Sequence, residues 1–563
     1  MARCCVRLLI VWPLLVAGAM AWDPDEYSPL FPAPVFQSNG SRVLRIYPNV
    51  SWTIISGSTS EIVNKAITRY QKIMFAWPAR STPMFSAKVD VDGILKQICV
   101  KVESTSDDLP TLAMNESYTL TVGVEDSGKD VVLTAPTVWG VLRGLESLSQ
   151  LVEWDSASEA YLIRKSPWKI RDFPRFKHRG LLIDTARHFL QVKTILRQID
   201  AAAFVKFNVI HWHIVDADSF PFQSKPYPEL SRLGAYSAEA VYTAEDVARV
   251  VEYGRQRGIR VLVEFDLPSH STSWRLAKPD LFINCGVGPD GDFEGISRML
   301  DPTAPGLDDF LEPFFSDVAS RFPDPVLHLG GDEINVGCLN RSAGVRAWVD
   351  AHNSTIVDLV LDFERRVHAI ASRHNKTVQL WADTFAAAKL VNSSLPQSVI
   401  VQVWGRAPSV SEVVKSGHRV VRSTGYYLSS GNSATGGCPV VWEDIYDTDI
   451  MPEGLSAAEE ARVLGAEAAM WGEVTDDFNI DSKTWLRASV LAERLWSQNS
   501  TIAAAGAPWP ASYHSPDISS RMVKNRCRLL QRGIQAQPYN TQALPDRNRW
   551  IQCQLWLPPR SET

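Results

Sequence analysis

Carboxylates, imidazoles and aromatic rings follow short apolar segments in the second half of the sequence. Tryptophan faces bind the apolar C–H faces of a sugar ring, carboxylates and arginine bind its hydroxyls, and a carboxyl pair can supply acid and base to a glycosidic bond. This combination predicts a carbohydrate site. The groups concerned are Asp184, Arg187, His211, His213, Asp216, Glu264, Asp266, His270, Asp332, Glu333, Trp381, Asp383, Trp404, Tyr426, Tyr427, Trp471 and Glu473.

Asp332 and Glu333 form an adjacent acidic pair directly after Gly330-Gly331. Neighbouring side chains on a strand point to opposite faces, so both can serve one substrate only where the strand ends and each approaches a different part of it. The glycines permit close backbone approach at this point. The pair predicts two separate chemical tasks; the alternative is an ordinary acidic pair that caps the next helix.

His211 and His213 raise the alternative of a metal-dependent hydrolase, because an HxH at a strand end places two imidazoles on one face. Such an enzyme needs further histidines at later strand ends. The fifth, sixth and eighth predicted strands offer none, and His418 precedes the seventh. We therefore expect no metal and no cofactor, and a supporting or packing role for at least one of the two histidines.

A repeated pattern of apolar strand, polar or aromatic cluster and amphipathic helix must position these groups. It predicts strands over 180–183, 209–215, 261–265, 326–329, 378–381, 400–404, 420–423 and 466–470, and helices including 192–207, 244–257, 307–322 and 356–374, with Thr243 and Asp246 capping the second of these. Eight such units indicate an α/β fold, a (β/α)8 TIM barrel whose carboxyl strand ends carry the site. The alternative is a doubly wound open sheet, but no GxGxxG follows the first strand.

The chain divides into four expected parts: a signal peptide over 1–21, an N-terminal α+β domain over 22–170, the catalytic barrel over 171–510, and a C-terminal segment over 511–563 that packs on the barrel. Strands over 118–122 and 131–134 and a helix over 61–75 support the smaller domain. The polar, proline-punctuated segment 165–174 is expected to link it to the barrel.

Arg3 and Arg7, an apolar stretch over 8–20 and the triplet Ala19-Met20-Ala21 predict a signal peptide cleaved after Ala21. The alternative, a membrane anchor, needs a longer apolar stretch, so no stable anchor is expected. We expect a route through the secretory pathway to a lysosome, a vacuole or the cell exterior. Glycosylation sequons support this route at Asn39, Asn49, Asn115, Asn340, Asn353, Asn375, Asn392 and Asn499.

The net charge of -6 comes without any long run of lysine and arginine, so no nucleic-acid partner is expected. Of eight cysteines, Cys4 and Cys5 leave with the signal peptide, and some of the remaining six should pair in an oxidising compartment. They show no zinc-binding spacing. The six are Cys99, Cys285, Cys338, Cys438, Cys527 and Cys553.

Seven strings in this order closely resemble the glycoside hydrolase family 20 β-N-acetylhexosaminidases, including the animal lysosomal enzymes: RGLLIDTARHF, NVIHWHIVDADSFPF, RGIRVLVEFDLPSH, LHLGGDEI, VQVW, AAMWGE and LAERLWS. The resemblance runs from about residue 110 to the tail. It implies an exo-acting, retaining enzyme that removes terminal GlcNAc or GalNAc by substrate-assisted catalysis, in which no enzyme carboxylate attacks carbon 1. Families with this chemistry are exceptions among glycosidases, most of which use one carboxyl group as acid and a second as nucleophile or base.

The resemblance also assigns roles to individual residues. Glu333 would protonate the leaving oxygen and later deprotonate water, which calls for a raised pKa. Asp332 would orient the 2-acetamido group and stabilise the oxazolinium ring, while Tyr427 would hold the acetamido carbonyl oxygen. The predicted substrate-binding residues are Trp381, Trp404 and Trp471 as walls, Arg187 and Glu473 as hydroxyl ligands, and Asp216 and His270 as support for Glu333.

For Asp216 and His270 the alternative is a buried ion pair that only supports the barrel. Where the lysosomal enzymes usually carry Asp or Asn for the outermost hydroxyl, this chain has Ser429, and Ser430 offers no arginine for acidic sugars. Neutral sugars are therefore favoured.

The resemblance further implies disulfides Cys285–Cys338 and Cys527–Cys553 and a homodimer; it leaves the pairing of Cys99 and Cys438 open. A non-catalytic glycan-binding barrel is the remaining alternative function. Chitin oligomers, N-glycans and glycolipids all stay open as natural substrates.

Overall fold

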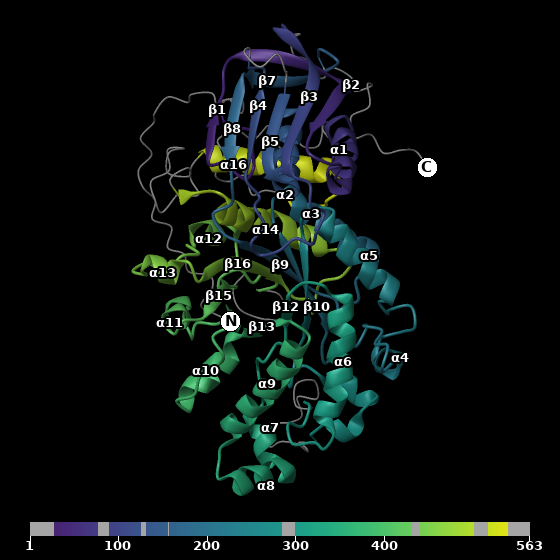
Figure 1. The fold of residues 1–563 in the computed structure, drawn as a ribbon, viewed down its shortest axis with the longest axis vertical. Coiled ribbons are helices and arrows are strands. Elements are labelled where there is room, and N and C mark those ends of the chain that lie inside the picture. The colour runs from purple at the N-terminus through teal and green to yellow at the C-terminus, as the bar shows by residue number, and fades with distance from the viewer. Residues whose placement is uncertain are drawn as a thin grey trace.

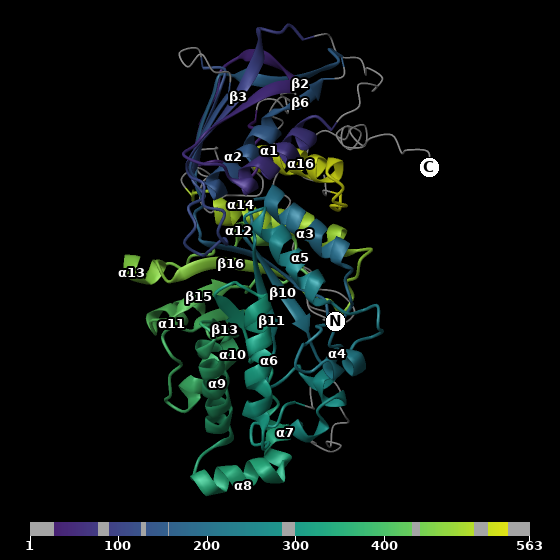
Figure 2. The ribbon, with the colours of Figure 1, turned by 45° about the vertical axis from the view of Figure 1, so that its right-hand side comes forward.

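The computed structural model describes residues 27–76, 89–124, 131–155, 157–283, 299–430, 440–499 and 516–538. Two β-structures organise them, an open sheet and a closed barrel. Figures 1 and 2 show the sheet above the barrel along the long axis of the molecule. The α/β fold with a smaller α+β domain before a TIM barrel is therefore confirmed.

The N-terminal sheet is mixed, with the strand order β1-β8-β4-β5-β3-β2-β7-β6. Two helices that pack on each other, α1 and α2, line its barrel-facing side (Figure 1). α2 is buried along its whole length because it lies between the sheet and the barrel. The elements are β1 Phe36–Ser38, β2 Arg42–Ile55, α1 Glu61–Met74, β3 Gly93–Ser104, β4 Tyr118–Val122, β5 Val131–Thr137, α2 Val138–Leu151, β6 Glu153–Asp155, β7 Ala160–Ser166 and β8 Trp168–Asp172.

Eight parallel strands close the barrel in the order β9 to β16. Their residues are almost all buried, because helices cover the outside and side chains fill the inside. The strands are β9 His178–Asp184, β10 Val209–Val215, β11 Arg260–Phe265, β12 Val326–His328, β13 Thr377–Trp381, β14 Ile400–Val403, β15 Arg419–Arg422 and β16 Val463–Met470.

The connections between barrel strands are helical. They contain α3 Val192–Phe204, α4 Glu229–Gly234, α5 Ala244–Arg255, the 3-10 turns Thr272–Leu276 and Pro279–Leu281, α6 Leu307–Arg321, α7 Val336–Arg341, α8 Ala343–His352, α9 Ile356–Arg373, α10 Ala382–Leu390, α11 Val410–Lys415, α12 Trp442–Asp447 and α13 Ala457–Glu460; α14 Ile480–Trp496 and α16 Pro516–Gln531 follow the last strand.

All eight predicted barrel strands are present, each with its ends within three residues of the expected bounds. The predicted cap is also present: Thr243 accepts the backbone N–H of Asp246, whose carboxylate accepts the N–H of Thr243. The expected linker is wrong in part. Residues 168–172 form β8, which pairs with β1 and β4, since Trp168, Ile170 and Asp172 alternate as its buried face. The prolines around this segment conceal the strand pattern in the sequence.

Buried ion pairs join the two domains. Lys206, at the end of α3, lies 2.8 Å from Asp172 of β8, and Trp496 of α14 donates its indole N–H to the same carboxylate at 2.9 Å. Arg521 of α16 pairs with Glu493 of α14, and Arg532, the residue directly after α16, pairs with Glu146 of α2. The C-terminal segment thus contacts the N-terminal domain as well as the barrel.

Cys338 and Cys527 are disulfide-bonded, whereas Cys99 is a free, buried thiol. The proposed partners Cys285 and Cys553, and Cys438, lie outside the described residues, so both pairings stay predictions. Seven of the eight sequon asparagines are exposed; Asn499 is half-buried and accepts a hydrogen bond from Arg175. No helix within the described ranges combines the length and apolar character that a bilayer crossing requires.

Glu116 provides a test of the domain interface. Its buried carboxylate accepts from Arg143 of α2 at 2.8 Å and from Arg179 of β9 at 2.6 Å. We expect Glu116→Gln to lower the free energy of unfolding by roughly 3 kcal/mol or more, because it leaves two buried guanidinium groups without a countercharge. Urea denaturation measures this, with the exposed Glu103→Gln as control. A loss below about 1 kcal/mol, the level typical of surface changes, would contradict the assigned role.

Candidate active site

The carboxyl ends of the barrel strands bring the predicted site residues together. Asp332 and Glu333 follow β12, and Trp381 ends β13. Tyr427 forms a bridge with Ala469 of β16, and Trp471 comes directly after that strand. The chain segments that follow β9, β10 and β11 supply Arg187, Asp216 and His270.

The backbone that leads into the acidic pair is left-handed at two consecutive glycines. Gly330 and Gly331 have φ values of 68° and 88°, and a Cβ on Gly330 would lie 1.8 Å from Oδ1 of Asp266. Glu333 itself has φ 50°, and His270 has φ 55°. Two non-glycine residues in the left-handed region store strain, a feature that clusters at functional sites. The close approach predicted for the glycines is therefore present.

Glu333 is 46% exposed and in contact with His270, whose Nε2 lies 3.2 Å from its Oε2. The raised pKa expected for this carboxyl is not found. The hydrogen bond from His270 lowers the pKa of Glu333 and outweighs the effect of partial burial. Asp383 accepts the backbone N–H of Glu333, which fixes the main chain of the acidic pair.

Asp332 lies in a different environment from its neighbour. It is nearly buried, and burial raises its pKa to about 6 although the charge of His270 opposes the rise. Its carboxyl group shares a hydrogen bond with Asp266. Burial raises the pKa of Asp266 as well, and the charge of Asp332 adds to that rise. Oδ1 of Asp332 has no hydrogen-bond partner among the described residues. A buried carboxylate oxygen without a donor is costly, so this atom is suited to receive one from a ligand.

Three tryptophans and a tyrosine form one aromatic wall. Trp381 is 5.9 Å from Trp471 between ring centroids, and Tyr427 is 6.3 Å from Trp471 and 6.1 Å from Trp404. Indole N–H groups fix the wall: Trp404 donates to Asp383 at 2.6 Å, and Trp381 donates to Glu264 at 2.7 Å. Burial raises the pKa of Tyr427, and the charge of Asp332 adds to the rise, so this hydroxyl keeps its proton.

Arg187 lies among acidic groups at one side of the wall. Its guanidinium lies 3.0 Å from Asp184, 2.8 Å from Asp216 and 3.3 Å from Asp218. Burial raises the pKa of Glu473 although the charge of Arg187 opposes the rise, and Oε2 of Glu473 has no hydrogen-bond partner within the described part of the chain. Arg187 is thus held rigidly, while Glu473 has an oxygen available for a ligand hydroxyl.

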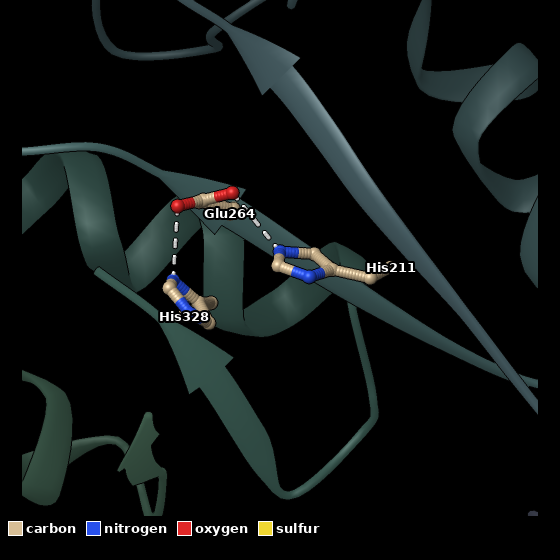
Figure 3. A group of neighbouring side chains, drawn as sticks. All are labelled: His211, Glu264 and His328. Carbon is tan, nitrogen blue, oxygen red and sulfur yellow. Dashed lines mark ion pairs between the residues drawn. The ribbon is translucent and has the colours of Figure 1, made fainter. Parts of the chain in front are cut away.

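Behind the site, imidazoles and carboxylates alternate through the barrel interior. We call this set the core network; its members are His178, His211, His213, His328, Asp216, Glu264 and Glu467, all buried. Figure 3 shows Glu264 between His211 and His328, one carboxylate oxygen directed at each imidazole. Both nitrogens of His211 and of His213 lie within 3.0 Å of a carboxylate oxygen.

The sequence prediction missed three members of this network, His178, His328 and Glu467, because each lies in a barrel strand whose other residues are mostly apolar. A single ionisable residue within an apolar strand could have indicated them, because such a residue is seldom buried without a partner. His211, Glu264 and His328 are close enough together to hold a metal ion. Both oxygens of Glu264 are already hydrogen-bonded, to Trp381 and His213, and Nδ1 of His328 accepts the backbone N–H of Gly330. Nε2 of His211 and Nε2 of His328 have no hydrogen-bond partner among the described residues. The expected absence of a metal therefore stays a prediction.

A (β/α)8 barrel whose mouth joins an acidic pair to an aromatic wall belongs to the class of carbohydrate-active barrel enzymes. Comparison with protein families identifies which one. The model for the glycosyl hydrolase family 20 catalytic domain matches residues 176–499, and a model described as beta-acetyl hexosaminidase like matches residues 30–151. The chain belongs to glycosyl hydrolase family 20, and it is a glycoside hydrolase.

Similar proteins cover nearly the whole chain. The rat beta-hexosaminidase subunit alpha is 35% identical over 93% of this chain and 96% of its own length, and the pig subunit beta is 36% identical over 95% and 97%. Among solved structures, a chitobiase from Flavobacterium johnsoniae superposes with a TM-score of 0.74 at 27% identity, covering 91% of this chain and 74% of that one.

The buried titratable groups make stability depend on pH in two directions. Burial raises the pKa of Glu364, which lies behind Gly331, to about 8, and carboxylate neighbours outweigh burial to raise His211 to about 9 and His213 to about 10. These groups hold their protons to a higher pH in the folded state than in the unfolded chain. Their contribution to the free energy of unfolding therefore declines as pH rises above roughly 4.5 for the glutamate and 6.5 for the histidines. The lowered pKa values of Glu264 and Glu467 act oppositely, and their contribution is lost below about pH 4.5.

We therefore expect the thermal unfolding midpoint to be highest between roughly pH 4.5 and 6.5. Glu364→Gln should flatten the decline between about pH 5 and pH 8, because it removes a group that folding keeps protonated. Calorimetry across this range measures both effects. A midpoint that is highest near pH 8, or an unchanged slope in the variant, would show that these groups do not control stability.

Proposed function

We propose that this glycoside hydrolase is an exo-acting, retaining β-N-acetylhexosaminidase that removes terminal GlcNAc or GalNAc by substrate-assisted catalysis. One observation carries the proposal: Asp332 has a buried oxygen without a donor, its charge acts on the Tyr427 hydroxyl, and Glu333 follows it with its own side chain half-exposed. An acetamido group offers an N–H and a carbonyl oxygen side by side, which complements a carboxylate and a hydroxyl. The names of the rat and pig relatives support the same substrate class.

Asp332 and Tyr427 act on the acetamido group. The free carboxylate oxygen accepts the substrate N–H, and the protonated Tyr427 hydroxyl donates to the carbonyl oxygen. These two contacts hold the carbonyl oxygen in place for attack on carbon 1. Because the nucleophile belongs to the substrate itself, the step is intramolecular and avoids the entropy cost of bringing two reactants together. The oxazolinium ring that forms carries positive charge, which the carboxylate of Asp332 stabilises in a site of low dielectric.

Glu333 acts on the glycosidic oxygen. Its half-exposed carboxyl can approach the leaving group from the open side of the mouth. A bound sugar covers this group and removes water from it, and desolvation raises a carboxyl pKa. Substrate binding therefore opposes the effect of His270 and favours the protonated acid. After the leaving group departs, the carboxylate takes a proton from the water that opens the oxazolinium ring.

The remaining residues hold the sugar ring. Glu473 accepts hydroxyl hydrogens, and Arg187 is the rigid cation beside it. Trp471 and its neighbours in the aromatic wall provide flat apolar faces for the C–H bonds of the ring. Ser429 is buried and uncharged, which favours neutral sugars.

We further propose that the protein enters the secretory pathway and forms a homodimer. The N-terminal signal pattern and the seven exposed sequon asparagines support the route. A stability maximum on the acid side, as expected from the buried titratable groups, would suit a lysosome or vacuole. Phe478, 96% exposed in the segment after β16, offers an apolar contact near the mouth, and the rat and pig relatives are named as subunits.

The catalytic assignment predicts the behaviour of one substitution. Glu333→Gln should lower kcat on a 4-nitrophenyl β-N-acetylglucosaminide by at least about 100-fold, because an amide cannot donate a proton to the leaving oxygen. The thermal unfolding midpoint should stay unchanged, since the side chain is half-exposed. The exposed Glu453→Gln serves as the matched control. Activity retained in the first variant would remove Glu333 from the mechanism.

The secretory route predicts a processed, glycosylated product. Expressed in eukaryotic cells, the full chain should begin at Trp22 and lose mass when its N-glycans are removed enzymatically. N-terminal sequencing and gel electrophoresis before and after deglycosylation measure this. An intact Met1 and no shift in mass would contradict the route.

A further inference from the structure

Glu264 makes four close contacts, and they divide between its two carboxylate oxygens. Oε1 accepts the indole N–H of Trp381 at 2.7 Å and lies 3.0 Å from Nδ1 of His328. Oε2 lies 2.6 Å from Nδ1 of His213 and 3.0 Å from Nε2 of His211. Trp381 and His213 are hydrogen-bonded to the two oxygens, one to each. His328 and His211 add charge contacts, since Nδ1 of His328 accepts from Gly330 and Nε2 of His211 has no hydrogen-bond partner among the described residues. The group is fully buried and cannot contact substrate.

The Oε1 side leads to the aromatic wall. Trp381 is 1% exposed, and its indole N–H can only donate a hydrogen bond. The position of its acceptor, Oε1 of Glu264, therefore fixes the position of the indole ring. Trp381 packs against Trp471 and Leu182 at the mouth. Under the proposed function this ring borders the acetamido pocket.

The Oε2 side leads to the general acid. Nε2 of His213 lies 2.8 Å from Asp216, the other oxygen of Asp216 lies 3.2 Å from Nδ1 of His270, and Nε2 of His270 lies 3.2 Å from Glu333. Every link pairs an imidazole nitrogen with a carboxylate oxygen. Three residues therefore separate Glu264 from Glu333 without a break.

We propose that Glu264 is a positioning residue that holds both halves of the active site in register, the acetamido wall through Trp381 and the general acid through His213, Asp216 and His270. This inference rests on the proposed function. The strand register explains why one residue can serve both: Glu264 is level with His213 on β10 and His328 on β12, and Trp381 lies two residues above the β13 neighbour of His328. Figure 3 shows its carboxylate between neighbouring strands.

Glutamine at this position can serve one half only. Its single carbonyl oxygen can accept from Trp381 or from His213, and its NH₂ group repels whichever donor remains. Glu467 provides the matched control. It is equally buried and lies 2.7 Å from His211 and 3.0 Å from His178. Its hydrogen bonds and ion pairs within the described residues go to His178, His211 and Gln402, and not to Trp381, His213 or Asp216.

The experiment compares the wild type, Glu264→Gln and Glu467→Gln. We expect Glu264→Gln to lower kcat/KM on the 4-nitrophenyl glycoside by about 100-fold, the effect of displacing reacting groups by about 1 Å, while Glu467→Gln loses less than about tenfold at a similar drop in thermal midpoint. Binding of a thiazoline that mimics the oxazolinium ring, measured by calorimetry, should weaken about tenfold in the first variant only. Equal losses in the two variants would overturn the proposal.

A wild type without activity on this glycoside would instead refute the proposed function itself. If Glu264→Gln does not fold, His213→Asn tests the general-acid half alone. That variant should lose more activity on a glycoside with a poor leaving group than on a dinitrophenyl glycoside, which needs little protonation, and should bind the thiazoline with unchanged affinity. The same loss on both glycosides would overturn the proposal.

Discussion

The alternation of imidazole and carboxylate inside the barrel is the constraint on which the site depends. A barrel core is normally filled by branched apolar side chains, and a lone buried charge there is very costly. Here opposite charges alternate, so that the buried Glu264, His213 and Asp216 stabilise one another. Such a network tolerates change poorly, because removal of one member leaves an uncompensated charge. In return it holds the groups at the mouth in one arrangement.

The mouth adds a second constraint, which acts on the backbone. Gly330 and Gly331 turn the chain against Asp266, and this turn places consecutive residues in different surroundings. Asp332 is nearly buried with a raised pKa, whereas Glu333 is half-exposed with a lowered one. Two adjacent carboxyl groups thus differ in ionisation through their environments alone, and a single strand end can supply both a charge stabiliser and a proton donor.

The sequence predicted the barrel well, because buried parallel strands are short apolar runs and each one ended in a polar cluster. It also placed Asp332, Glu333 and the tryptophans at one mouth. Three features escaped it. β8 was hidden by flanking prolines. His178, His328 and Glu467 lie in strands whose apolar residues dominate the pattern. The pKa of Glu333 is set by His270, a residue distant in sequence whose approach depends on tertiary structure.

α16 has a consequence for how the protein matures. It is made after both domains, yet its Arg521 neutralises Glu493 of the barrel, and Arg532 directly after it neutralises Glu146 of the N-terminal domain. Until Arg521 and Arg532 have left the ribosome, each domain keeps an acidic group that the finished molecule buries. A nascent chain halted before α16 would therefore expose charge and apolar surface at the junction of the two domains.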